Sequence, residues 1–141
     1  MSARFFLDTN ILVYSFDPTA PLKRQKAASL VNEALISGKG CISLQVAQEF
    51  LNLCQRKFAV PMTAAEAAGY LRTTLASLCK VFPPVSLLED ALDLRQKLGY
   101  RFYGSLIVAA AREAGCEKLY SEDMHHGQSI GRLRIENPFV T

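Results

Sequence analysis

"RFFLDTNILVY", residues 4–14, decides the fold, because an acid interrupts an otherwise apolar run there. Residues 4–7 are short, apolar and aromatic, which predicts a buried strand. Asp8 follows directly, and the run from Ile11 to Tyr14 resumes the apolar pattern. A carboxylate inside a segment that is otherwise suited to burial indicates a special role, because a buried charge is costly unless it has partners.

The composition is that of an ordinary folded protein. The 141 residues are half hydrophobic and 21% charged, which suits one domain over residues 1–141. The apolar stretches are too short to span a bilayer and no secretory signal pattern is present, so we expect a cytoplasmic protein without a membrane partner. The net charge of +3 permits a nucleic-acid partner without requiring one. The four cysteines form no CxxC pair and are expected to be reduced, buried thiols.

Strand and helix patterns alternate along the rest of the chain. Capping-box spacings begin at Thr63 and at Ser86. We predict helices over residues 23–37, 44–58, 63–79, 86–98 and 105–114. We predict further strands over residues 41–43, 81–82 and 118–120, and a last edge strand over residues 132–136. This order predicts an α/β fold, an α/β/α sandwich around a mostly parallel sheet.

Acidic residues follow two of the predicted strands directly. Asp8 ends the first strand and Glu122-Asp123 follows the strand at 118–120, so both would lie at the same edge of a parallel sheet. Glu49, on the polar face of the helix after residues 41–43, can lean over that edge. Singly, each acid has a simpler explanation as a turn, cap or solvated helix residue. Together they repel one another, and a divalent cation such as Mg²⁺ or Mn²⁺ would neutralise them.

Four segments carry a resemblance to a known family: "FLDTNILVYSFD", "SLQVAQEFLNL", "RFYGSLIVAAAREAGC" and "KLYSEDMHHGQ". Together they resemble the PIN-domain ribonucleases, and most closely the toxin half of bacterial VapBC-type toxin–antitoxin pairs. The resemblance implies a sheet of four or five strands and Mg²⁺- or Mn²⁺-dependent hydrolysis of RNA, often in transfer or ribosomal RNA loops. It also implies a homodimer and a cognate VapB-type antitoxin that inserts a peptide near the acidic pocket.

The resemblance further assigns roles to particular residues. Three acids match metal ligands of the family, and three small polar residues match supporting positions: Asp8, Glu49 and Asp123, with Thr9, Asn10 and Ser121. The family's remaining acid belongs at the start of the helix "LIVAAA", where this chain has Gly104. Glycine offers no donor atom, so we expect a metal-dependent endoribonuclease that is weakened or inactive. The change is explained either by a substitution that disarms a toxic nuclease or by natural loss of activity.

Two other functions stay open. A catalytically silent PIN-fold module would bind RNA or the antitoxin without cutting, and a metal-dependent cleavage assay distinguishes it from a nuclease. A phosphotransfer or receiver-like domain would phosphorylate Asp8. However, Asn10 stands where a dehalogenase-type site needs a second acid, and the acidic pair and lysine of a receiver domain are not evident.

Several other side chains are expected to have structural roles. Four basic residues are expected to be solvated rather than bound to RNA phosphates: Lys23, Arg24, Arg56 and Lys57. Three aromatic residues are expected in the core rather than stacked on bases: Tyr14, Phe102 and Tyr103.

Overall fold

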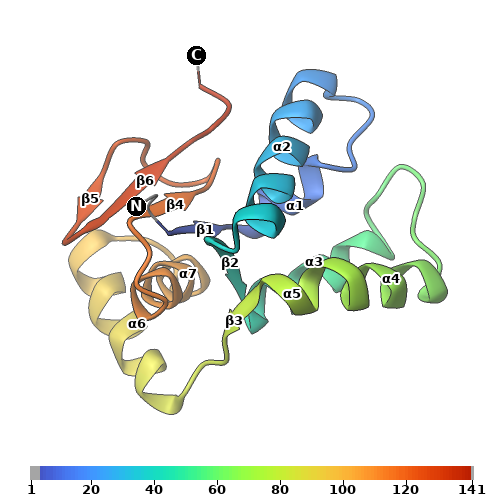
Figure 1. The fold of residues 1–141 in the computed structure, drawn as a ribbon. Helices are drawn as coiled ribbons and strands as arrows, with labels where there is room; N and C mark the ends of the chain where they lie inside the picture. Colours follow the sequence, from blue (N-terminus) through green and yellow to red (C-terminus); the bar gives the residue numbers. More distant parts are fainter. Residues whose placement is uncertain (1–3, 141) are drawn as a thin grey trace.

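A six-stranded sheet organises the protein, which a computed structural model describes over residues 4–140 (Figure 1). The strands are β1 (Phe5–Leu7), β2 (Gly40–Ser43), β3 (Cys79–Val81), β4 (Lys118–Tyr120), β5 (Ser129–Ile130) and β6 (Leu133–Glu136). The helices are α1 (Thr9–Tyr14), α2 (Pro21–Ser37), α3 (Leu44–Cys54), α4 (Ala64–Tyr70), α5 (Ala76–Leu78), α6 (Val85–Leu98) and α7 (Phe102–Glu113). A π-helical segment, η1 (Leu71–Leu75), joins α4 to α5.

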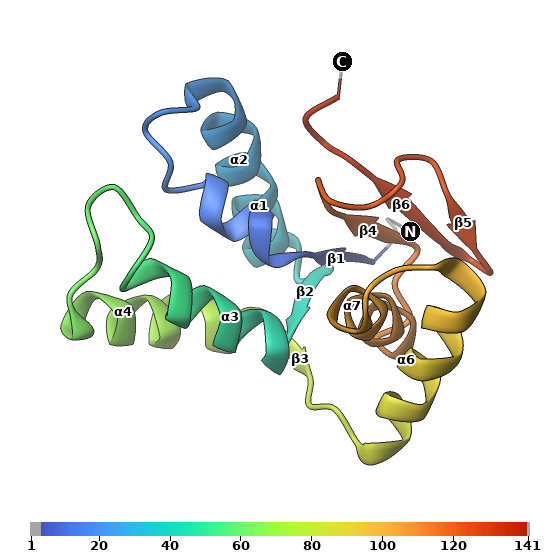
Figure 2. The same cartoon turned by 180° about the vertical axis from the view of Figure 1, so that it is seen from behind.

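The sheet has the strand order β3-β2-β1-β4-β6-β5, and only the pair β5–β6 is antiparallel. Helices α2 and α7 cover opposite faces of its central strands (Figures 1 and 2). The predicted α/β fold with a mostly parallel sheet is therefore confirmed. The expected number of four or five strands is too low, because β5 is a two-residue strand that carries no periodicity in the sequence.

The position of β1 explains its unbroken apolar sequence. It lies between β2 and β4 and is parallel to both, so all three of its residues are buried. Leu7 is in register with Tyr120, and the next residues along both strands leave the sheet at the same edge. The backbone N–H of Asp8 donates to the Tyr120 carbonyl at 3.0 Å, so the two chain segments remain together beyond the sheet.

A close approach between α2 and β2 requires glycine at position 40. An added Cβ there would lie 2.2 Å from Ala34 Cβ and 2.7 Å from the Phe5 ring. Such distances leave no room for any side chain unless the helix moves. Gly40 therefore sets how tightly α2 packs on the start of β2.

Helix ends account for most differences from the predicted boundaries. The capping box at Thr63 is confirmed, because its hydroxyl accepts from the Glu66 N–H and the Glu66 carboxylate accepts from the Thr63 N–H. The capping box at Ser86 is wrong, because α6 begins at Val85 and Ser86 already lies within its first turn. The third helix ends at Cys54 rather than at residue 58, because the chain folds back there and the Met62 N–H donates to the Cys54 carbonyl. The last long helix begins at Phe102 rather than at residue 105.

The strand predicted at the edge, residues 132–136, lies inside the sheet. As β6 it pairs with β4 on one side and with β5 on the other. Gly131, with a φ of 61°, makes the turn that joins β5 to β6. The edge position is therefore taken by β5.

All four cysteines are free thiols, and three of them are buried. The sulfur atoms of Cys41 and Cys116 lie 3.5 Å apart, whereas Cys79 is only half-buried. None of the helices in the described part of the chain has the length and apolar character needed to cross a bilayer.

Candidate active site

Asp8 is a buried carboxylate with two hydrogen-bond donors. The residue is 8% exposed; Oδ1 accepts from the Thr9 N–H at 2.7 Å and Oδ2 accepts from Ser121 Oγ at 2.7 Å. The first bond makes Asp8 the N-cap of α1, so the simpler explanation of Asp8 as a helix cap is also correct. Burial raises the pKa of Asp8 from 3.8 to about 6; the two hydrogen bonds oppose this rise, and the charges of Glu49 and Asp123 add to it.

Ser121 and Asn10 connect the end of β1 with the segment that follows β4. The fully buried Ser121 hydroxyl donates to Asp8 and also accepts from the Asp123 N–H at 3.2 Å. The Asn10 amide donates to Asp123 Oδ2 at 3.0 Å, and its oxygen accepts from the Glu122 N–H at 3.4 Å. These bonds fix where the Asp123 carboxylate points. By contrast, the buried Thr9 hydroxyl has no partner among residues 4–140, so Thr9 contributes only its backbone N–H.

Glu49 reaches the same region from α3. This helix begins directly after β2, and the side chain of Ser43, its N-cap, accepts from the Val46 N–H. One turn before Glu49, the Gln45 amide donates to Glu49 Oε1 at 2.9 Å and to the Tyr103 carbonyl at 3.3 Å. Gln45 therefore orients Glu49 and links α3 to the first turn of α7.

One pocket of about 610 Å³ contains all three predicted acids. Its lining residues are Asp8, Gln45, Glu49, Gly99, Tyr100, Arg101, Tyr103, Gly104, Ile107, Asp123 and Met124. Four of these residues were not predicted from the sequence to belong to a site: Gln45, Tyr100, Arg101 and Met124. Of these, only Gln45 could have been identified from the sequence, because it precedes Glu49 by four residues on the same helix face.

Gly104 is the third residue of α7 and borders this pocket. An added Cβ would lie 3.7 Å from Met124 Cε and 3.8 Å from Tyr100 Cβ, which are ordinary contacts. The first turn of α7 contains no acidic residue, and its N-cap, Arg101, makes no side-chain capping bond. The position therefore has both the space and the favourable helix-end electrostatics for a carboxylate that the chain lacks.

The oxygen atoms that line the pocket have the chemistry that suits a hard divalent cation. Carboxylate, hydroxyl and amide oxygens are the ligands that Mg²⁺ and Mn²⁺ prefer, and a cation would relieve the cost of ionising the buried Asp8. Within residues 4–140, however, no three His, Cys, Asp or Glu side chains are close enough together to hold a metal ion. A carboxylate at position 104 would add oxygen ligands on the α7 side of the pocket.

Glu122 points away from the pocket and adds no carboxylate to it. Its carboxylate accepts from Tyr14 Oη at 2.7 Å and forms an ion pair with Lys23 Nζ at 2.5 Å. Burial alone would raise the pKa of Glu122, but the hydrogen bonds from Lys23 and Tyr14 outweigh it and keep the pKa below its usual value. Lys23 also lies 4.8 Å from the centre of the Tyr14 ring, so the expectation that Lys23 is simply solvated is wrong.

Comparisons with known proteins agree with this architecture. Residues 5–127 match the PIN domain family. A solved structure described as a toxin–antitoxin complex from Klebsiella pneumoniae contains a chain that is 18% identical, with a TM-score of 0.66 and 98% of each chain covered. No curated protein sequence matches the chain. The structural likeness extends over nearly the whole length of both chains.

Proposed function

Since this chain belongs to the PIN domain family, whose members are generally nucleases, we propose that it is the toxin of a bacterial toxin–antitoxin pair. Its scaffold is that of an endoribonuclease dependent on Mg²⁺ or Mn²⁺, and Gly104 weakens or abolishes the activity. The observation that carries this proposal is the single pocket that gathers Asp8, Glu49 and Asp123 beside the acid-free start of α7.

The partners follow from the same proposal. The structural neighbour from Klebsiella pneumoniae comes from a toxin–antitoxin complex, which supports a cognate VapB-type antitoxin as a partner of this chain. The substrate would be RNA, with transfer or ribosomal RNA loops as the first candidates. The protein would act in the cytoplasm as a homodimer.

Asp8, Glu49 and Asp123 would hold the cation. When bound, Mg²⁺ or Mn²⁺ would supply the positive charge that stabilises a phosphodiester during displacement and makes water a better nucleophile. Ser121 would keep Asp8 oriented through its 2.7 Å hydrogen bond, and Asn10 would do the same for Asp123. Such supporting bonds fix the directions in which ligand oxygens point, and they contribute strongly to metal affinity.

An RNA cleavage assay with Gly104→Asp tests the proposal. The variant should cleave transfer or ribosomal RNA at least about ten-fold faster than the unmodified chain in Mg²⁺ or Mn²⁺, because a ligand carboxylate matters at least as much as its supporting bonds. EDTA should abolish the gain, and so should Asp8→Asn introduced into the same variant. Gly104→Asn is the matched control, since it fills the same space without the charge.

The proposal fails if folded Gly104→Asp cleaves no faster than Gly104→Asn. That result would favour the second candidate function, a catalytically silent PIN-fold module that binds RNA or the antitoxin. Two observations favour this candidate: position 104, where the family resemblance implies an acidic ligand, is glycine, and the described chain has no three-residue metal group. Circular dichroism of both variants verifies folding.

A further inference from the structure

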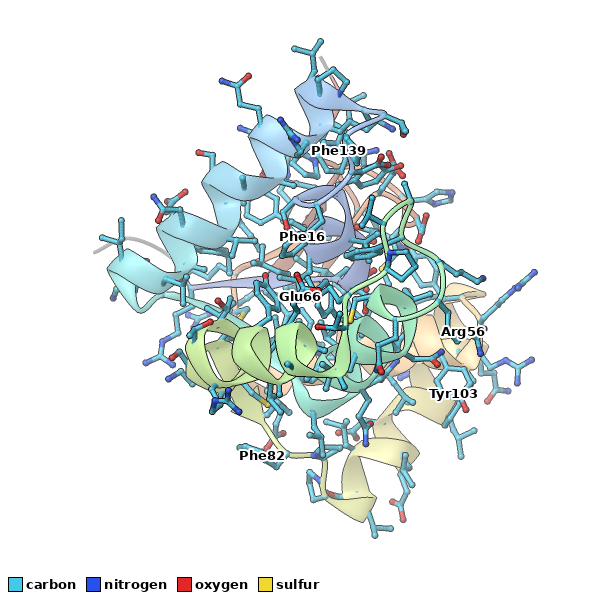
Figure 3. The ribbon with its side chains drawn as sticks, turned by 90° about the vertical axis from the view of Figure 1, so that its right-hand side faces the viewer. Phe16, Arg56, Glu66, Phe82, Tyr103 and Phe139 are labelled. Carbon is cyan, nitrogen blue, oxygen red and sulfur yellow. The ribbon has the colours of Figure 1, made fainter. Side chains whose placement is uncertain are left out.

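Tyr103 is an exposed aromatic residue at the edge of the acidic pocket. It retains 68% of its surface accessible and lines the pocket beside Gly104. The expectation that Tyr103 packs in the core is therefore wrong. The buried face of α7 is formed by later residues such as Leu106 and Ile107, while Tyr103 in the first turn projects outward (Figure 3).

The ring of Tyr103 is exposed and contacts one neighbouring ring. Its backbone carbonyl accepts from the Gln45 amide on α3 at 3.3 Å. Its ring meets the ring of Phe102 edge to face, with the centroids 5.7 Å apart, and Phe102 packs against the core. A tyrosine side chain has few rotatable bonds, so it loses little conformational entropy when a flat ligand stacks on it.

Positive charge lies close to this ring. Arg101 is exposed, lines the same pocket and makes no ion pair with any other residue in the range 4–140. Arg56, which follows α3, extends on the same side of the molecule as Tyr103 (Figure 3). An aromatic ring beside an unpaired guanidinium group, here that of Arg101, is a combination with which proteins bind single-stranded nucleic acids.

We infer that Tyr103 and Arg101 form a binding subsite for single-stranded RNA at the rim of the acidic pocket. Tyr103 stacks on an unpaired base, and Arg101 binds a neighbouring phosphate. The inference rests on the proposed function, in which RNA is the substrate, and it specifies unpaired RNA. In a continuous duplex the faces of the bases are covered by their neighbours, so no base is available to the ring.

Fluorescence anisotropy with a labelled single-stranded RNA of mixed sequence tests the inference on the full chain, in EDTA. Tyr103→Ala should bind about ten-fold more weakly, and Tyr103→Phe should bind like the unmodified chain. Phe82→Ala is the matched control: Phe82 is also 68% exposed, but it follows β3 away from the pocket (Figure 3). This variant should leave the affinity unchanged.

An abasic RNA of the same length separates stacking from charge. Tyr103→Ala should have no effect on abasic RNA, because there is no base to stack. Arg101→Ala should weaken the binding of both RNAs and should reduce the slope of log affinity against log salt by about 0.7, the value for one phosphate contact on a single strand.

Three results would overturn the inference. The first is that Tyr103→Ala binds mixed-sequence RNA as tightly as Phe82→Ala does. The second is that Tyr103→Ala lowers the affinity for abasic RNA as much as that for mixed-sequence RNA. The third is that Tyr103→Ala changes only the oligomeric state in size-exclusion chromatography. The last result would assign Tyr103 to a contact between copies of the chain. If Gly104→Asp cleaves RNA while Tyr103→Ala binds normally, only this inference fails. If neither the unmodified chain nor Gly104→Asp binds RNA, the proposed function fails with it.

Discussion

Replacing Asp8 with Asn should stabilise the protein at neutral pH, because the folded state ionises Asp8 at a cost. Its pKa is about 6 in the folded protein and 3.8 as the ordinary value, mainly because the side chain is buried. This pKa difference of about two units means that ionising Asp8 lowers the free energy of unfolding by about 3 kcal/mol. The unfolded chain releases the proton first, so stability falls as the pH rises from about 4 to about 6 and then levels off.

The two proteins should therefore have different pH profiles. A protonated Asp8 has one carbonyl oxygen, as Asn has, so near pH 4 the two stabilities should agree to within about 1 kcal/mol, the value of one hydrogen bond. Above pH 7 Asp8→Asn should be more stable by about 3 kcal/mol, and cleavage by an active Gly104→Asp background should be lost. The stabilising and inactivating effects of one substitution would then have the same cause.

Urea denaturation followed by circular dichroism between pH 4 and pH 8, in EDTA, measures these stabilities in a chain that has no tryptophan. The control is Asp90→Asn on α6, where the side chain is exposed, and its profile should run parallel to that of the unmodified protein. The reasoning would be refuted if the unfolding free energy of Asp8→Asn also changed with pH in parallel with that of the unmodified protein. That result would mean that Asp8 does not lie in a desolvated, negatively charged pocket.

Other substitutions test the packing around the site. Gly40→Ala should lose more than about 2 kcal/mol of unfolding free energy in urea, since its Cβ would lie 2.2 Å from a side chain of α2. Gly104→Ala should gain about 0.5 to 1 kcal/mol in the same assay, because the space is free and alanine favours the helix; a loss at position 104 would contradict this. Lys23→Ala should release Glu122 and speed amide hydrogen exchange in residues 121–124, whereas Lys26→Ala on the same helix should not; equal exchange in both would contradict a positioning role for Lys23.

The parts of the fold that depend on local pattern were predictable. The apolar run of β1 and the capping box at Thr63 have sequence signals that do not depend on distant partners. The helix α1 was not predicted, because its six residues show no helical periodicity and its start depends on the Asp8 side chain. Likewise, β5 is too short to have a pattern and exists only through its pairing with β6.

The candidate site was predictable only in outline. Asp8 and Asp123 were identified because both follow strands, and parallel strands end at one edge. The bonds from Ser121 to Asp8 and from Asn10 to Asp123 join residues 113 positions apart, and they depend on the register of β1 and β4. Tyr103 was misplaced because α7 begins before residue 105, where the sequence predicted it to start.

The affinity for Mn²⁺ at the acidic pocket tests the central claim most directly. Isothermal titration calorimetry would compare the two size-matched variants Gly104→Asp and Gly104→Asn. We expect at least about ten-fold tighter Mn²⁺ binding by Gly104→Asp, and loss of that binding when Asp8→Asn is added. Equal affinities in the two variants, or binding that survives Asp8→Asn, would contradict a cation held by the carboxylates at this edge of the sheet.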